Sequence, residues 1–251
     1  MTTYETPKNT IEFKVYGKYA LFTDPITKIG GEKCSYQIPT YEAIKGICKS
    51  IYWKPTFIWI VDEIKVINKI EMERKGVRPI KYNGGNDLSI YTYLKDVEYQ
   101  VRAHFEWNEF RKDLEKDRKS GKHYEIAKRS LEKGGRQDIF LGTRECQGYV
   151  EPCNFSDSKS KYDAVENLSF GNMFHSFGYP DEASNGEQIN KKCLVARLWS
   201  AKMEKGIIKF PKPNECEYCR KVKFAEYSVI NKIKNVDEEY EEIFGNKEAK
   251  I

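Results

Sequence analysis

A glycine followed by two side chains capable of proton or phosphate chemistry, Gly121-Lys122-His123, stands at the predicted start of a helix. Histidine titrates near neutral pH without perturbation, and the positive end of the helix dipole disfavours its charged form. The positive charge of Lys122 also disfavours the charged form of His123, and it can neutralise a phosphoryl oxygen. These residues predict a base-competent imidazole beside a cation. The alternative is a pair of ordinary polar residues in an exposed first turn.

Tyr52 is a second candidate, at the end of an earlier predicted helix. The apolar stripe of that helix comprises Ile44, Ile47, Cys48 and Ile51. Tyr52 falls at the edge of the stripe, on the side of Lys45 and Lys49, so we expect a packed ring with an exposed hydroxyl. A cation one turn away favours the phenolate. The alternative is a tyrosine that only rims the core.

Two glycines with basic neighbours form a third candidate, in the run Leu-Glu-Lys-Gly-Gly-Arg of residues 131–136. Gly134 and Gly135 can let a phosphate backbone approach main-chain N–H groups, with Arg136 beside it. A plain helix C-cap explains the same glycines. The pattern leaves both interpretations open.

The other reactive side chains do not form the pattern of a metal centre. Cys216 and Cys219 make a single C-x-x-C pair, whereas a structural zinc ion needs four ligands, and the acidic residues are scattered. The sequence contains neither a P-loop nor an H-E-x-x-H motif. We therefore expect no metal and no cofactor. A phosphodiester would then be cut with the substrate's own 2′-OH as the nucleophile.

The net charge is unevenly distributed along the chain. The 251 residues contain 43 Lys and Arg against 38 Asp and Glu, a net charge of +5. Residues 237–251 hold six acids and two lysines, so they carry −4 and residues 1–236 carry +9. A basic body in a chain that is 14% aromatic is typical of nucleic-acid binding, since cations hold phosphates and rings stack on bases. A solvated surface of mixed charge is the plainer interpretation.

The apolar segments are too short for a membrane protein. The longest wholly apolar run covers residues 57–61, whereas a membrane-spanning helix needs roughly 20 apolar residues. The polar residues 1–10 lack the apolar segment of a secretion signal. Because the cysteine count of seven is odd, we expect reduced thiols in a cytoplasmic protein without membrane contact.

The elements that must position these candidates follow the order β-α-β-β-α-β. The predicted strands cover residues 11–15, 56–70, 97–107 and 138–141, and the predicted helices begin near residues 40 and 122. This order predicts an α+β, ferredoxin-like (RRM-like) fold, in which both helices cover one face of an antiparallel sheet. Residues 71–94 contain the turn signal Asn-Gly-Gly-Asn and predict a basic β-hairpin inserted between core strands.

Three regions follow from this reading. We assign residues 1–146 to the ferredoxin-like domain. Residues 147–230 predict a small antiparallel β-sheet domain, because short β-like pieces alternate with turn residues and end in a hairpin across residues 204–206. Residues 231–251 form a charged tail, either a helix or a disordered segment.

Four segments resemble those of a known family. They are residues 19–25 (Tyr-Ala-Leu-Phe-Thr-Asp-Pro), 50–55 (Ser-Ile-Tyr-Trp-Lys-Pro), 121–124 (Gly-Lys-His-Tyr) and 138–146 (Asp-Ile-Phe-Leu-Gly-Thr-Arg-Glu-Cys). In order and spacing, from about Ile11 to Pro213, they are similar to the type I-C (Dvulg subtype) CRISPR-associated repeat endoribonuclease of the RAMP superfamily. The resemblance does not reach the C-terminal residues.

The resemblance implies a ferredoxin-like domain followed by a small β-sheet domain. It implies an enzyme that cuts the repeat hairpins of precursor CRISPR RNA without metal, leaving a 2′,3′-cyclic phosphate (or a 3′-phosphate) and a 5′-OH. The family's catalytic tyrosine, lysine and histidine match Tyr52, Lys122 and His123. It also implies that the protein stays with the mature CRISPR RNA in the Cascade complex, beside the backbone and large subunits.

The predicted RNA ligands are mainly basic residues. They are Lys45, Arg74, Lys75, Arg78, Lys81, Gly134, Gly135, Arg136 and Arg144. Those of the hairpin would read the shape and phosphates of a repeat stem, because A-form RNA hides its base edges in a deep groove. Two other functions stay open: a non-catalytic Cascade subunit that binds the 5′ handle of CRISPR RNA, and a factor that binds duplex DNA. The adjacent Lys122 and His123 argue against a pure binder.

Overall fold

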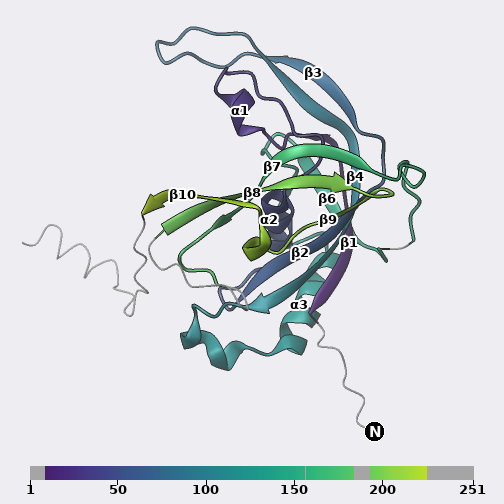
Figure 1. The fold of residues 1–251 in the computed structure, drawn as a ribbon, viewed down its shortest axis with the longest axis vertical. Helices are drawn as coiled ribbons and strands as arrows, with labels where there is room; N and C mark the ends of the chain where they lie inside the picture. The colour runs from purple at the N-terminus through teal and green to yellow at the C-terminus, as the bar shows by residue number, and fades with distance from the viewer. Residues whose placement is uncertain (1–8, 156, 184–192, 225–251) are drawn as a thin grey trace, which may run out of the picture.

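The computed structural model describes residues 9–155, 157–183 and 193–224. Its strands are β1 (Thr10–Ala20), β2 (Phe57–Val66), β3 (Glu71–Val77), β4 (Ser89–Trp107), β5 (Ile139–Phe140), β6 (Gln147–Pro152), β7 (Leu168–Gly178), β8 (Cys193–Met203), β9 (Ile207–Lys209) and β10 (Tyr218–Phe224). The α-helices are α1 (Pro25–Lys28), α2 (Tyr41–Ile51) and α3 (Ser120–Glu132), and the 3-10 helices are η1 (Lys112–Asp117) and η2 (Pro213–Glu215). Figure 1 shows their arrangement. The predicted tail, residues 231–251, lies outside the described residues.

A larger sheet with β1 and β4 near its centre forms the body. Its strands follow the order β5-β6-β1-β4-β2-β9, β3 pairs with the first part of β4, and every pairing is antiparallel. Along β1 the apolar residues Ile11, Phe13 and Val15 alternate with polar ones and are at most 4% exposed. In register with them, Val101 of β4 lies between Phe13 and Ile64 of β2. The predicted strand alternation therefore builds one buried face.

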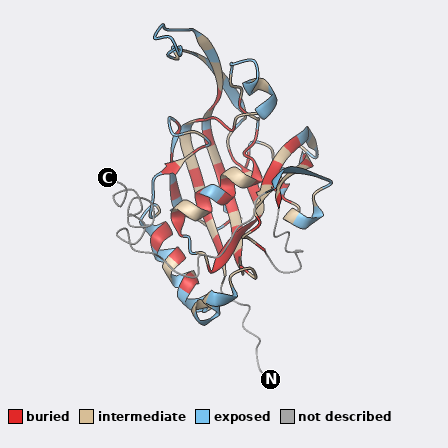
Figure 2. Cartoon of the chain, turned by 90° about the vertical axis from the view of Figure 1, so that its left-hand side faces the viewer, coloured by how far each residue is buried: buried red, intermediate tan, exposed pale blue. Residues whose placement is uncertain are grey.

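The two longer helices pack into the same core as this face (Figure 2). The hydroxyl of Thr40 caps α2 by accepting a hydrogen bond from the N–H of Ala43, as the predicted helix start requires. The α2 helix contacts β2, and α3 contacts β1, β6 and α2. The end of α2 and the beginning of α3 thereby lie close together, although about 70 residues separate them in the chain.

The fourth core strand differs from the prediction. Residues 138–141 contribute only the two-residue β5 at the sheet edge, and β6 takes the place beside β1. Between them Gly142 adopts a φ of +96°, and an added Cβ would lie 2.1 Å from the carbonyl oxygen of Leu21. Only glycine fits this turn, which reverses the chain and brings β6 back along β1.

The predicted hairpin over residues 71–94 is confirmed. The β3 strand pairs with β4 from Glu71 opposite Lys95 to Val77 opposite Ser89. Gly84 at its tip has a φ of +87°, as a tight turn requires. The hairpin projects from the body in Figure 1 and is largely exposed in Figure 2.

A second, three-stranded sheet has the order β10-β8-β7 and contacts α2 through β7. The predicted turn at residues 204–206 joins β8 of this sheet to β9 of the larger sheet, through paired backbone hydrogen bonds between Glu204 and Ile207. The larger sheet thus continues past residue 146 through β6 and β9. The α+β class, with antiparallel sheets and a second small sheet, is confirmed. No helix of the described residues is long and apolar enough to cross a membrane.

Candidate functional site

His123 occupies the first turns of α3 and is completely buried. Its Nε2 atom lies 2.8 Å from the carbonyl oxygen of Asp117, and its Nδ1 atom lies 2.9 Å from the hydroxyl of Tyr52. A carbonyl can only accept, so Nε2 carries the proton of the neutral ring. It follows that Nδ1 is the acceptor and the Tyr52 hydroxyl is the donor.

Aromatic rings enclose this imidazole. The rings of Phe57, Phe105 and Trp107 lie 5.3, 6.4 and 5.9 Å from it, centroid to centroid, in edge-to-face arrangements. They come from the first residue of β2 and the last residues of β4, which pair in the sheet. The enclosure excludes water from the Tyr52–His123 hydrogen bond. His123 is therefore not an exposed histidine in the first turn of the helix.

Tyr52 differs from the prediction in both position and ionisation. It is the C-cap of α2, with φ −160° and ψ 132°, so it leaves the helix and its place on a helical wheel no longer applies. The residue is 1% exposed, and its hydroxyl faces His123 rather than solvent. Burial raises the pKa of the Tyr52 phenol, the charge of Asp117 raises it further, and Arg136 lowers it. The predicted phenolate is wrong, and the phenol is neutral.

Asp117 is the functional candidate that the sequence analysis missed. Its Oδ1 atom lies 2.5 Å from the ammonium of Lys122, and its Oδ2 accepts a hydrogen bond of 2.9 Å from the hydroxyl of Thr56. The same Oδ2 lies 3.4 Å from His123 Nε2. Hydrogen bonds from Lys122 and Thr56 lower the pKa of Asp117. Asp117 is the last residue of the short 3-10 helix η1, in the polar segment between β4 and α3, where sequence periodicity offers no signal.

The glycine pair acts as a helix cap in this structure. The N–H groups of Gly134 and Gly135 donate to the carbonyls of Leu131 and Ser130, both glycines having positive φ. The next two N–H groups, of Arg136 and residue 137, both donate to the carbonyl of Ser50. The turn after α3 therefore fastens the end of α2, two residues before Tyr52.

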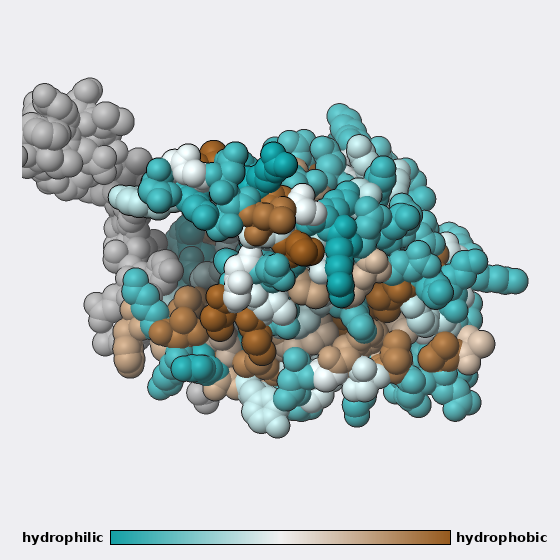
Figure 3. Space-filling model, turned by 90° about the horizontal axis from the view of Figure 1, so that it is seen from above, coloured by the Kyte–Doolittle hydropathy of each residue, from teal (hydrophilic) through white to brown (hydrophobic). Residues whose placement is uncertain are grey.

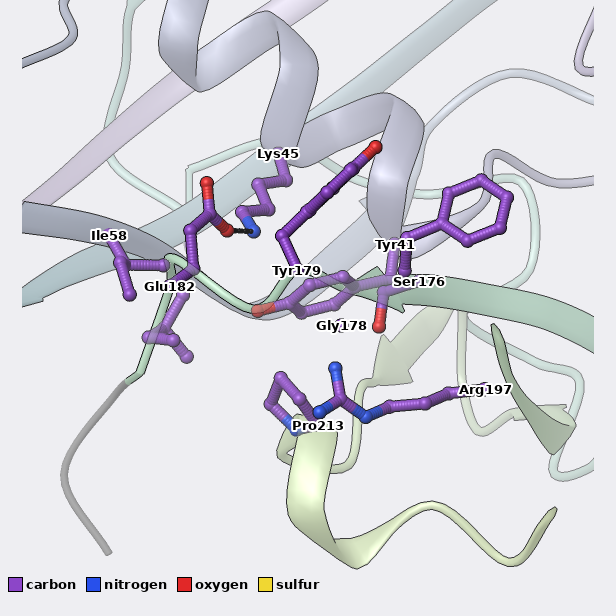
Figure 4. Close-up of a pocket in the computed structure, with 11 residues that line it drawn as sticks. Tyr41, Lys45, Ile58, Ser176, Gly178, Tyr179, Glu182, Arg197 and Pro213 are labelled. Atoms are coloured by element: carbon purple, nitrogen blue, oxygen red, sulfur yellow. Dashed lines mark hydrogen bonds and ion pairs between the residues drawn. The ribbon is translucent and has the colours of Figure 1, made fainter. Parts of the chain in front are cut away.

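Lys45 is placed differently from the other predicted RNA ligands. Its side chain is 6% exposed, and its ammonium lies 2.7 Å from the carboxylate of Glu182 (Figure 4). The same carboxylate also pairs with Lys49. Residues following β7 cover this side of α2, an arrangement the helix pattern could not reveal. Lys45 is therefore not offered to an RNA phosphate in this structure.

The remaining predicted cations lie at two separate places. Arg136 is exposed, and its guanidinium lies 5.6 Å from the centroid of the Tyr52 ring. The cations of the hairpin are Arg74, Lys75, Arg78 and Lys81, and Arg144 is exposed on the turn before β6. The hairpin and α3 lie at opposite ends of the molecule (Figure 1), so the hairpin does not join the Tyr52–His123 pair. Seen from the hairpin end, the surface is mostly hydrophilic with scattered apolar patches (Figure 3).

No group of three or more histidine, cysteine or carboxylate side chains in the described part of the chain is arranged to hold a metal ion. Cys216 and Cys219 flank the start of β10, where Cys219 is exposed.

Comparison with known proteins places this chain in a protein family. A family model described as "CRISPR-associated protein (Cas_Cas5)" matches residues 10–211. The chain belongs to this Cas5 family. The matched residues of this Cas5 protein include β1 through β9, and so contain Tyr52, Asp117, Lys122 and His123.

Relatives of this Cas5 protein include two that are named CRISPR pre-crRNA endoribonuclease Cas5d. The relative from Thermus thermophilus is 29% identical over 193 residues, which cover 72% of this chain and 79% of the relative. The relative from Mannheimia succiniciproducens is 31% identical over 161 residues, 55% of this chain and 69% of the relative.

Two solved structures resemble this Cas5 protein along most of its length. A crystal structure of a CRISPR-associated protein is 40% identical, with a TM-score of 0.70. A functionally uncharacterized protein from Streptococcus mutans is 41% identical, with a TM-score of 0.69. Each comparison covers 84% of this chain and 96% of the other.

Proposed function

We propose that this Cas5 protein is an endoribonuclease that cleaves the repeat hairpins of precursor CRISPR RNA without a metal ion. The observation that carries the proposal is the buried hydrogen bond between Tyr52 and His123, with the exposed ammonium of Lys122 next to it. The names of the two curated relatives support the same activity. The nucleophile is the ribose 2′-OH of the substrate, so the products carry a 2′,3′-cyclic phosphate and a 5′-OH.

The hydrogen-bond directions assign the proton transfers. Tyr52 donates to His123 Nδ1, so the phenol can accept the proton of the 2′-OH as its own proton passes to the imidazole. The 2′ oxygen then attacks phosphorus, the bond to the 5′ oxygen breaks, and that oxygen takes a proton from water. After the products separate, His123 returns its proton to Tyr52, and Tyr52 releases one proton to the hydroxide that was left when water protonated the 5′ oxygen. General acid–base help of this kind contributes about 10²–10⁴-fold to the rate.

Two cations complete this arrangement. The ammonium of Lys122 is half-exposed and held by Asp117, so it can neutralise the charge that develops on the phosphoryl oxygens. The guanidinium of Arg136 lies over the buried Tyr52 ring. In our proposal the RNA reaches the phenol when Arg136 turns from the ring to a phosphate.

We extend the proposal to fold and partners. The strands β6, β1, β4 and β2, with α2 and α3 between them in sequence, form a ferredoxin-like unit in the β-α-β-β-α-β order. The hairpin cations hold the repeat stem through its phosphates. After cleavage the protein remains with the mature CRISPR RNA in Cascade, beside the backbone and large subunits, as the resemblance of the sequence to the type I-C proteins implies.

Cleavage of a labelled repeat hairpin in EDTA tests the activity. We expect a single cut with a cyclic phosphate and a 5′-OH, and no cut when the nucleotide at that position carries a 2′-deoxyribose. The Lys122→Ala variant should cleave at least tenfold more slowly, because it loses the phosphoryl-binding charge. Lys128→Ala removes an exposed lysine farther along the same helix and serves as the matched control.

The outcomes separate the competing functions. Cleavage of the deoxy substrate would refute the 2′-OH nucleophile. Tight binding of the hairpin with no cleavage under any condition would replace the enzyme with a 5′-handle-binding subunit. Preference for duplex DNA over the RNA hairpin at equal salt would favour the DNA-binding alternative.

A further inference from the structure

A hollow lies at the N-terminal end of α2, whereas Tyr52 lies at the C-terminal end. It has a volume of about 350 Å³ and lies between the end of β1, the start of α2, the turn before β6, and β7. Its aromatic wall is formed by Phe22, Phe174 and Phe177, and the rings of Phe174 and Phe177 lie 4.8 Å apart. This volume is within the range of pockets that hold small ligands.

The lining of the hollow also includes polar groups. Glu42 lines it, and its Oε2 atom accepts a hydrogen bond of 3.3 Å from the N–H of Phe177. Among the described residues its Oε1 atom accepts none. Thr40 lines the hollow beside it. A flat ligand with an N–H donor at its edge would stack on the phenylalanines and donate to this carboxylate. Nucleobases have this chemistry.

A short segment joins this hollow to Tyr52. The N–H groups of residues 136 and 137 bind Ser50 at the end of α2, whereas Gly142 packs against Leu21 and Thr143 lines the hollow. Residues 136–143 therefore run beside α2, from Tyr52 to the hollow. An exposed arginine, Arg136 or Arg144, lies at each end of the segment.

The length of α2 sets the distance. Ten residue steps from Tyr41 to Ile51 rise about 15 Å along the helix. A stacked nucleic-acid strand advances about 3.4 Å per nucleotide, so the path covers no more than about five nucleotides.

We propose that this hollow binds one unpaired base of the RNA substrate, within about five nucleotides of the bond that is cut. Arg136 and Arg144 then hold phosphates between this base and Tyr52. The proposal rests on the proposed endoribonuclease function and names a subsite that sets where the enzyme cuts. Glu42 favours a base that presents N–H donors at its edge, and guanine presents two adjacent ones.

The test replaces each unpaired nucleotide next to the cut with an abasic nucleotide. We expect one position at which this change weakens binding by roughly 5- to 150-fold, the range for loss of one stacked base. Ala43→Leu places a larger side chain in the hollow, and Phe177→Leu removes one stacking ring. Both variants should bind intact RNA as weakly as the wild type binds the sensitive abasic RNA, and they should show no further loss with that abasic RNA.

A control on the same helix separates occupancy of the hollow from a change in α2. A Cβ added at the exposed Gly46 has no neighbour within 4 Å, so Gly46→Ala should leave both affinities unchanged. Melting temperatures identify any variant that is simply misfolded. The subsite is overturned if no abasic position weakens binding. It is also overturned if the abasic change weakens RNA binding to Ala43→Leu as much as it weakens binding to the wild type. Failure of the wild type to cleave intact RNA overturns the endoribonuclease function instead.

Discussion

Tyr52→Phe removes one oxygen atom from the centre of the site and leaves the packing in place. The ring lies 5.6 Å from Phe57 and 6.0 Å from His123, centroid to centroid, and phenylalanine preserves both contacts. The hydroxyl donates to His123 Nδ1 at 2.9 Å and is buried. The variant therefore leaves Nδ1 without its donor inside an aromatic enclosure.

Two magnitudes follow from this geometry. An unsatisfied buried acceptor costs about 1–3 kcal/mol of stability, which lowers the melting temperature of a 251-residue protein by about 2–4 °C per kcal/mol. Loss of the proton relay lowers the single-turnover cleavage rate by about 10²–10⁴-fold. Affinity for a 2′-deoxy RNA should stay close to that of the wild type, because this RNA lacks the hydroxyl that the phenol contacts in the proposed mechanism.

Single-turnover cleavage at saturating protein measures the rate, and a filter-binding titration with a 2′-deoxy substrate measures the affinity. The double variant Tyr52→Phe/His123→Asn gives the sharper test. If the two residues pass one proton in series, the double variant should be no slower than the slower single variant. Multiplicative losses would refute the relay, and wild-type cleavage by Tyr52→Phe would remove Tyr52 from the mechanism.

Three further predictions concern stability. Glu182→Gln should lower the free energy of unfolding in denaturant by about 3–5 kcal/mol, because it removes the carboxylate partner of the buried Lys45 ammonium. Its affinity for RNA should stay unchanged, and an equal loss of RNA affinity would contradict the burial of Lys45. Burial lowers the pKa of His175 to about 3, so below pH 6.5 this histidine takes up a proton when the protein unfolds. The free energy of unfolding should therefore fall by about 1.4 kcal/mol per pH unit between pH 6 and pH 4. The His175→Gln variant should lack this part of the pH dependence. Gly142→Ala should destabilise the protein by at least about 2 kcal/mol in the same assay, because its Cβ would lie 2.1 Å from the oxygen of Leu21; a neutral effect would show that the turn can relax.

The sequence predicted those parts of the fold that depend on neighbouring residues. The Thr40 cap, the apolar stripe of α2 and the strand alternation of β1 are local patterns, and each is found in the structure. The turn at Gly84 and its flanking strands are equally local. Strand pairing is not local. The identity of the strand beside β1 depends on the reversal at Gly142, which no periodicity announces.

The candidate site divides in the same way. Residue type and spacing singled out Tyr52, Lys122 and His123, but the sequence placed the tyrosine hydroxyl in solvent. Helical-wheel reasoning assigns a side chain to a face of its own helix, whereas Tyr52 has left α2. For His123 the sequence left an exposed first turn open as an alternative, and the structure excludes it because the imidazole contacts Tyr52 in the junction between the two helices. Asp117 was missed because its role arises only from contacts with these neighbours.

The backbone sets the distance between Tyr52 and His123. The carbonyl of Ser50 accepts two N–H groups from the turn that follows α3, and the carbonyl of Asp117, at the end of η1, orients the imidazole of His123. Main-chain groups after α3 therefore fix its C-terminal end against α2, and a main-chain group before α3 fixes the ring of His123. The glycine pair permits this turn and so influences the position of Tyr52 without contacting it. A change at Gly134 or Gly135 would shift Ser50, and Tyr52 would move with it. Of the two interpretations of the glycine pair, the helix cap is found in the structure, whereas contact of these glycines with an RNA phosphate stays a prediction.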